Sequence, residues 1–311
     1  YAEDLKVFFE WLYEANPAIK NDKPDIRHIT ADDLSALQTF DIEEYMESLR
    51  IRIDKKGDEF YNSDAAIKRK MAALRGLYAY LYKNDLIDNN PTAKVDMPKL
   101  HEKAIVRMDV DEIARFLDTV EDGAENMTDR QRKFHELNKC RDLAMMTLML
   151  GTGIRVTECV GLDINDVDIP NSRIKVTRKG GYEAFVYFGQ EVSEALIPYL
   201  EERNNITDVV EGHENALFLS SRKRRISVRN VEIMVKNYAV HVTTLKKITP
   251  HKLRSSYGTA LYQETGDIYL VADVLGHKDV NTTKKHYAAI EENRRRMAKD
   301  IVKLRENTPK D

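Results

Sequence analysis

The stretch from residue 249 to residue 290 most constrains what this chain can fold into, because its helix starts and stops can be read directly. Thr249 is a favourable helix N-cap, and Pro250 suits the first position of a helix. Gly266 predicts the end of this helix, and Gly276 predicts the end of a second helix with apolar residues at helical spacing. The stretch therefore predicts two consecutive helices, followed by a third, short one.

Four side chains capable of phosphate chemistry occur in this stretch. They are, in chain order, His251, Arg254, His277 and Tyr287. His251 and Arg254 are three positions apart, so they share one face of the first predicted helix near its N-terminus. A helix N-terminus attracts anions, and a guanidinium group fits phosphate oxygens. Such a pair is also common on exposed helices, and a tyrosine near a helix end is more often a core residue. We interpret the pair as half of a phosphate site.

The same stretch resembles the second motif of the tyrosine recombinases, the family of phage integrases and Xer-type recombinases. It contains H-x-L-R, then L-G-H, then a tyrosine ten residues after that histidine. The first motif of the family is T-G-x-R followed by a glutamate three positions later, and it supplies Arg155 and Glu158. The two motifs together are highly specific, and the resemblance covers nearly the whole chain.

The surroundings of Arg155 predict an anion site as well. Residues 137–150 predict a buried helix, and the glycines that follow break it. Thr152 or Gly153 then caps the next helix, which places Arg155 in its first turn, where an anion is favoured. A surface pair of Arg155 with Glu158 is the alternative. We expect instead that Glu158 orients the arginine from behind.

A β-hairpin follows, and it is the only clear β region that the sequence predicts. Residues 173–177 and 182–188 predict two strands, and Arg178-Lys179-Gly180-Gly181 predicts the turn between them. In isolation, a lysine in such a turn is usually solvated. The resemblance implies that Lys179 is the catalytic lysine, a mobile ammonium group that can protonate a leaving oxygen. Arg178 is the neighbour with which it could be confused.

Residues 1–95 predict an all-helical domain of four helices. The helices are expected at residues 5–12, after Thr30 with Asp33, at residues 42–49 and at residues 67–81. From apolar spacing alone this could be any small bundle. The resemblance implies that it is the core-binding domain, which clamps DNA opposite the catalytic domain. A linker is expected at residues 96–106.

The catalytic domain is expected at residues 107–311, as an α+β domain with a small antiparallel β-sheet in a chain that is mainly α. Its other predicted elements are a helix capped by Asp109 at 110–117, a polar loop or frayed helix at 123–134, and helices at 190–204 and 228–241. An extended piece that leads to a basic loop is predicted at 217–225. A charged helix is predicted at residues 291–303. This tail packs on its own domain or, as the resemblance implies, docks on a neighbouring protomer.

The formal net charge of −3 and the pI near 6.3 argue mildly against nucleic-acid binding. Basic clusters near the motifs argue the other way, since charges can segregate on a surface. These clusters are at residues 222–225, 246–247, 284–285 and 294–296. We expect double-stranded DNA as the partner of a homo-oligomer, a dimer on one site and a tetramer in the synapse.

Composition also limits the setting of the protein. The two cysteines, Cys140 and Cys159, predict no disulfide framework and a reducing compartment. No apolar run approaches the roughly 18 residues that cross a bilayer. We expect no membrane contact and a cytoplasmic, nucleoid-associated protein. Because the chain opens with Tyr1 and not with Met, we also expect it to be a piece of a longer protein.

The resemblance implies six catalytic side chains, with Glu158 behind them: Arg155, Lys179, His251, Arg254, His277 and Tyr287. Tyr287 would attack phosphorus and form a 3′-phosphotyrosyl link. A phenol has a pKa of about 10, so His251 is the candidate base, and His277 would donate a hydrogen bond to the phosphate. The bond energy stays in the phosphotyrosine, so no cofactor, metal or ATP is expected.

Two departures from the family pattern occur. Tyr287 lies ten residues after His277, where nine is the commoner interval, and one extra helical residue would turn it by about 100°. Either the loop at 278–281 absorbs the extra residue or Tyr287 is delivered differently. Ser255 stands where the family often has histidine. The alternatives to a recombinase are a type IB topoisomerase, or a DNA-binding module without catalysis.

Overall fold

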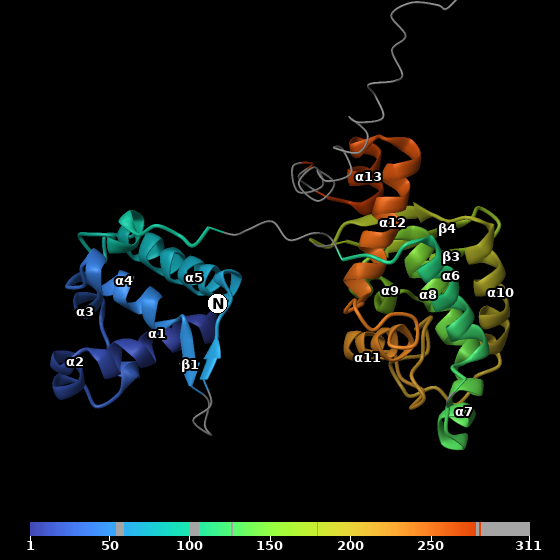
Figure 1. Cartoon of the computed structure of the whole chain (residues 1–311), viewed down its shortest axis with the longest axis horizontal. Helices are drawn as coiled ribbons and strands as arrows, with labels where there is room; N and C mark the ends of the chain where they lie inside the picture. Colours follow the sequence, from blue (N-terminus) through green and yellow to red (C-terminus); the bar gives the residue numbers. More distant parts are fainter. Residues whose placement is uncertain (54–58, 100–105, 126, 179, 278–279, 281–311) are drawn as a thin grey trace, which may run out of the picture. The chain divides into compact units, whose positions relative to one another are not determined.

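The computed structural model describes residues 1–53, 59–99, 106–125, 127–178, 180–277 and 280. The chain divides into two compact units, Tyr1–Lys103 and Ala104–Asp311, each drawn in Figure 1. Both units are mostly helical, and the second contains a small antiparallel sheet. The predicted fold class is confirmed.

The first unit is built around the packing of α1 on α5. Its helices are α1 (Ala2–Ala15), α2 (Pro17–Asp22), α3 (Ala31–Ser35), α4 (Thr39–Ser48) and α5 (Asp64–Lys83), with the short 3-10 helices η1 (Ile26–His28) and η2 (Pro91–Lys94). Asn16 ends α1, and its side chain accepts hydrogen bonds from the first amides of α2. Thr30 and Asp33 form a capping box at the start of α3. Phe8, Tyr45 and Tyr78 are fully buried in the core.

A β-hairpin in this unit contradicts the prediction that residues 1–95 are entirely helical. Its strands are β1 (Ile51–Ile53) and β2 (Glu59–Tyr61), paired antiparallel with Ile51 opposite Tyr61. Three residues a strand are too few to show the alternation that marks a strand in a sequence. The four predicted helices are all present, as α1, α3, α4 and α5, and α2 is an additional one.

The second unit is organised around α8, which packs against α6, α10 and α12 (Figure 1). Its helices are α6 (Val110–Asp122), α7 (Asp129–Glu136), α8 (Lys139–Thr152), α9 (Val156–Gly161), η3 (Ile164–Asp166), α10 (Gln190–Asn204), α11 (Val228–Ala239), α12 (Pro250–Thr265) and α13 (Ile268–Leu275). Met145, Leu148 and Met149 of α8 are fully buried. This helix therefore forms the centre of the core.

The sheet of the second unit has three antiparallel strands in the order β3 (Val167–Asp168), β4 (Arg173–Thr177) and β5 (Glu183–Tyr187). Ile174 pairs with Val186, and both are buried in the core. The strands β4 and β5 confirm the predicted hairpin. The third strand was not predicted, because two residues cannot show a pattern.

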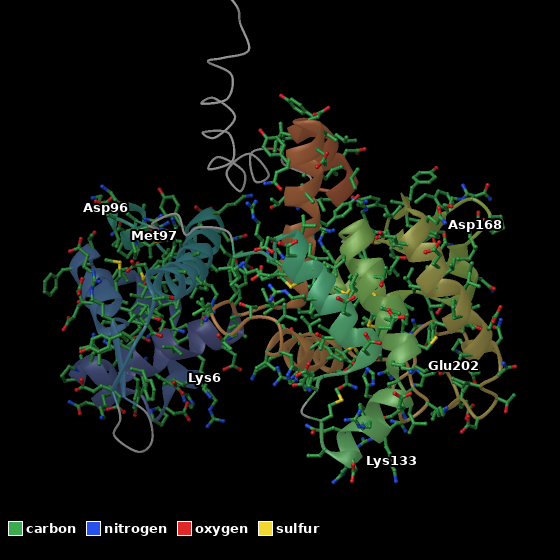
Figure 2. All side chains as sticks on the ribbon, turned by 45° about the vertical axis from the view of Figure 1, so that its right-hand side comes forward. Lys6, Asp96, Met97, Lys133, Asp168 and Glu202 are labelled. Atoms are coloured by element: carbon green, nitrogen blue, oxygen red, sulfur yellow. The ribbon has the colours of Figure 1, made fainter. Side chains whose placement is uncertain are left out.

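Three further predictions about this unit were inexact. The helix capped by Asp109 continues to Asp122. Part of the segment expected as a loop or frayed helix forms α7, which Thr128 caps and whose outer side chains, such as Lys133, point away from the unit (Figure 2). The piece at residues 217–225 is not extended throughout, because Leu219 pairs back with Arg225 around a tight turn.

The predicted C-terminal helix at residues 291–303 lies outside the described residues. Within the described part of the chain, no helix is both long enough and apolar enough to cross a membrane.

Candidate active site

Arg254 is the buried arginine of the second motif. Thr249 caps α12 and Pro250 takes its first position, so Arg254 lies in the second turn, as the sequence predicts. Only 5% of Arg254 is exposed. Its guanidinium donates one hydrogen bond to the carbonyl of Gly153, at 2.6 Å, and another to the carbonyl of Leu275. Arg254 thus ties α12 to the end of α8 and to the end of α13.

Arg155 lies before the first turn of its helix, because α9 begins later than predicted. It is the N-cap of α9 and has an extended backbone, whereas a place in the first turn was expected. Gly153 ends α8 in the left-handed conformation, with φ of +64°, so the chain is still extended when it reaches Arg155.

Glu158 holds Arg155 by two separate contacts. One carboxylate oxygen accepts a hydrogen bond from the backbone N–H of Arg155 at 2.8 Å, and the other accepts from its Nη1 at 2.7 Å. The side chain of Glu158 is 4% exposed and that of Arg155 is 34% exposed. The pair is therefore not a surface pair. The carboxylate is buried, and the guanidinium reaches partly into solvent.

The turn formed by the C-terminal end of α13 and Gly276 binds the arginines of both motifs. Helix carbonyls at a C-terminus lack intrahelical partners and carry partial negative charge. Leu275 and Gly276 supply such carbonyls, which accept from Arg254 and, at 3.2 Å, from Nη2 of Arg155. Arg178 joins them from the end of β4 by donating to the carbonyl of Val274 at 3.2 Å. Figure 1 shows α13 packed beside the C-terminal part of α12, which ends in Gly266.

The two histidines take different places around this turn. His277 directly follows Gly276 and is half-buried, and its backbone N–H donates to the carbonyl of Ala272 at 2.9 Å. His251 is exposed on α12, one turn before Arg254. The hydroxyl of Ser255 donates to the carbonyl of His251 at 3.0 Å, so it is engaged with its own helix.

The structure thus brings together Arg155, Arg254, Glu158 and the backbone of His277, and it places His251 on the same helix as Arg254. Lys179 and Tyr287 lie outside the described residues. Sequence reasoning did not foresee that Arg178 reaches this turn. The only signal for it was a second basic residue beside Lys179 in the hairpin.

Two other potentially reactive side chains near the site, Tyr257 and Cys159, are packing residues. Burial raises the pKa of the Tyr257 phenol, whose ring lies against Gly153. Burial also raises the pKa of the Cys159 thiol, which is fully buried in α9. Both groups therefore stay protonated at neutral pH, and Cys159 is a core residue as the sequence predicts.

Comparison with known proteins identifies the class to which this arrangement belongs. The profile of the Phage integrase family matches residues 106–294. The tyrosine recombinase XerC of Caldanaerobacter subterraneus subsp. tengcongensis is 31% identical over 290 residues, which cover 91% of this chain and 75% of that protein. The tyrosine recombinase XerS of Streptococcus uberis is 32% identical over 304 residues, with 91% and 84% covered.

Solved structures share the fold. A crystal structure of the XerH site-specific recombinase bound to a palindromic difH substrate has a TM-score of 0.70 at 20% identity, and covers 96% of this chain and 78% of that one. A lambda integrase dimer bound to a COC′ core site has a TM-score of 0.59 at 17% identity, with 92% and 94% covered.

The chain therefore belongs to the phage integrase family. Within it, the curated relatives are tyrosine recombinases, and this chain is likewise an enzyme of site-specific recombination. The predicted family and enzyme class are confirmed, and the topoisomerase alternative is not favoured.

Proposed function

We propose that this chain cleaves and rejoins double-stranded DNA through a covalent 3′-phosphotyrosyl link to Tyr287. The observation that carries the proposal is the convergence of Arg155 and Arg254 on one turn, with His277 directly after it. Negative charge builds on the non-bridging oxygens when a phosphodiester is attacked. Two permanently charged guanidinium groups held at one place can neutralise that charge without rearranging.

The remaining residues complete the reaction. The phenol oxygen of Tyr287 attacks phosphorus and gives its proton to His251, while His277 donates a hydrogen bond to a phosphate oxygen. The bond to the 5′-oxygen breaks, and that oxygen takes a proton from Lys179. The phosphotyrosine keeps the bond energy, so a 5′-hydroxyl from another duplex can reverse the step without ATP or a metal.

The assembly expected from the sequence is part of this proposal. Residues 1–95 would clamp the DNA opposite the catalytic residues 107–311, with residues 96–106 as the linker. Two protomers would bind one site and four would form the synapse, joined by the C-terminal helix, in a cytoplasmic protein that stays with the nucleoid. The complexes of XerH with difH and of lambda integrase with its core site support a DNA partner.

A covalent trapping assay tests the chemistry. The protein is incubated with nicked duplex fragments of its source genome, and adducts that resist denaturant are isolated. We expect an adduct for the wild-type chain and none for Tyr287→Phe, because phenylalanine has no oxygen to attack phosphorus. Peptide mass should place the nucleotide on Tyr287.

Tyr269→Phe is the matched control, since Tyr269 is a 71% exposed tyrosine of α13. It should form the adduct at the wild-type rate. An adduct that persists in Tyr287→Phe, or that maps to Tyr269, would contradict the proposal. Relaxation of plasmids that lack the trapped site would instead support a topoisomerase.

A further inference from the structure

Arg178 leaves the sheet at the point where β4 enters the hairpin turn. Its backbone is fixed on both sides of the turn, because its N–H donates to the carbonyl of Tyr182 and its carbonyl accepts from Gly181, both at 2.9 Å. Its side chain is not solvated like that of an ordinary turn residue. It reaches α13 and donates a hydrogen bond to the carbonyl of Val274, which lies 96 positions further along the chain.

The guanidinium of Arg178 lies directly against the backbone of Gly276. A Cβ atom built on Gly276 would overlap this guanidinium, so the close approach requires a residue without a side chain. Gly276 also has a φ of +62°, which favours glycine independently. The Nε atom of Arg178 is buried and, among the described residues, has no hydrogen-bond partner. Arg178 is therefore held by close packing against Gly276 and by its hydrogen bond to the carbonyl of Val274.

Three arginines from three distant segments share one turn. Arg178, Arg254 and Arg155 bond the successive carbonyls of Val274, Leu275 and Gly276. Arg155 and Arg254 belong to the proposed phosphate site, whereas Arg178 belongs to the hairpin that carries Lys179. The turn is thus a common support for these three arginines.

We propose that Arg178 is a positioning residue for the recombination reaction. It clamps the turn of residues 274–276 to the end of β4, so that the two phosphate-binding arginines and His277 keep one mutual arrangement. The inference rests on the proposed function for its effect on catalysis. A direct contact of Arg178 with a DNA phosphate is the competing explanation, and it makes a different prediction for binding.

The clamp itself can be tested without DNA, by hydrogen exchange on the full chain. The amides to follow are those of Gly276 and His277, which donate to Asp273 at 2.8 Å and to Ala272 at 2.9 Å. Loss of a hydrogen bond to a charged group should speed their exchange by about tenfold in Arg178→Ala. Arg229→Ala is the control, because Arg229 is an exposed arginine of α11. Unchanged exchange at the turn in Arg178→Ala would overturn the clamp.

The effect on catalysis is measured by single-turnover cleavage of the duplex recovered from wild-type adducts. Arg178→Ala should slow cleavage by about tenfold to a hundredfold, the loss expected when reacting groups are misplaced by about 1 Å. Its DNA affinity and the salt dependence of binding should stay at the wild-type values. Arg178→Lys should recover only part of the rate, because an ammonium group cannot fill the space of the planar guanidinium.

Gly276 gives a second, independent test of the same contact. Gly276→Ala should slow cleavage at least as much as Arg178→Ala does, since the new methyl group overlaps the guanidinium and alanine is strained at a φ of +62°. Adding Arg178→Ala to Gly276→Ala should then slow cleavage much less than Arg178→Ala slows the wild type, because the contact is already lost. An effect of Arg178→Ala that is as large in the Gly276→Ala variant as in the wild type would overturn the inference. So would a salt slope reduced by about one in Arg178→Ala, which marks a lost phosphate contact. If the wild-type chain forms no adduct, the proposed function fails, and hydrogen exchange still decides whether the clamp exists.

Discussion

Glu158 is the residue that gives Arg155 its orientation. Its buried carboxylate bonds both the backbone and the guanidinium of Arg155, at 2.8 and 2.7 Å. The guanidinium of Arg155 is therefore already fixed in one conformation before a phosphate binds. Charge stabilisation is most effective when the groups that provide it need not reorganise. The same carboxylate caps α9, so one residue serves both the helix and the site.

Gly153 is the residue whose replacement should be least tolerated near Arg155. It has a φ of +64°, and a Cβ there would overlap the ring of Tyr257 and lie 2.8 Å from Leu275. We expect Gly153→Ala to lower the free energy of unfolding by about 2–4 kcal/mol, from left-handed strain and overpacking together. Thermal unfolding measures this loss, and the trapping assay should show no adduct.

Gly161→Ala is the control for that experiment. Gly161 ends α9, and no atom lies within 4 Å of a Cβ placed on it. The variant should be as stable as the wild type or slightly more stable, because alanine favours a helix. Equal stability of Gly153→Ala and Gly161→Ala would show that the turn adapts and that the argument from space is wrong.

At the scale of elements, one acidic residue joins the first helix to the longest one. Asp4 of α1 accepts hydrogen bonds from Arg69 of α5, the shortest at 2.9 Å, and lies 3.5 Å from Lys70. The hydrogen bond from Arg69 lowers the pKa of Asp4, and burial only partly opposes this. The contact supplements the apolar packing of Phe8 and Leu12 on α5.

Asp4→Asn should therefore destabilise the protein in a pH-dependent way. The folded pKa is lower than the unfolded one, so the ionised form stabilises above the unfolded value near 3.8 and loses its effect as pH falls through the folded pKa. We expect a loss of about 1 kcal/mol at pH 7, kept small because Arg69 is largely exposed. Urea unfolding from pH 7 to pH 2 measures it.

The difference between Asp4→Asn and the wild type should shrink below pH 4. Glu10→Gln, which removes an exposed pair with Lys6 on α1, is the control and should have little effect at any pH. A constant difference down to pH 2 would mean that Asp4 acts through packing and not through its charge.

At the scale of the whole molecule, each unit has its own hydrophobic core. The core of the first unit is centred on α1, α4 and α5, and that of the second on α8 and its neighbours. No described residue belongs to both clusters. Separate cores are expected to fold and melt as separate units.

Limited trypsin digestion should therefore cut first between Lys99 and Arg107, within the predicted linker. We expect two fragments that persist, because each keeps a complete core. Mass spectrometry identifies the cut, and circular dichroism of the separated fragments tests whether each is helical. A first cut inside α5 or α8, or an unfolded fragment, would show that the two units depend on each other.

Much of the fold could be predicted from the helix caps and helix-ending glycines in the sequence. Gln190–Asn204 was predicted to the residue, and the ends of α12 and α13 follow from Gly266 and Gly276. Elements of two or three residues escaped prediction, as β1, β2 and β3 did. The helix α7 was ambiguous because, of its own residues, only His135 is buried, so its apolar pattern is too weak.

The sequence by itself determined the family, the helical character and the identity of the candidate site residues. Caps and glycine stops act within about four residues, so they can be read along the chain. Only the tertiary structure decided how the site is held together. The hydrogen-bonded partners are far apart in the sequence: Arg254 and Gly153 are separated by 101 residues, Arg155 and Gly276 by 121, and Arg178 and Val274 by 96. Contacts over such separations depend on how helices pack around α8, and no local pattern records them.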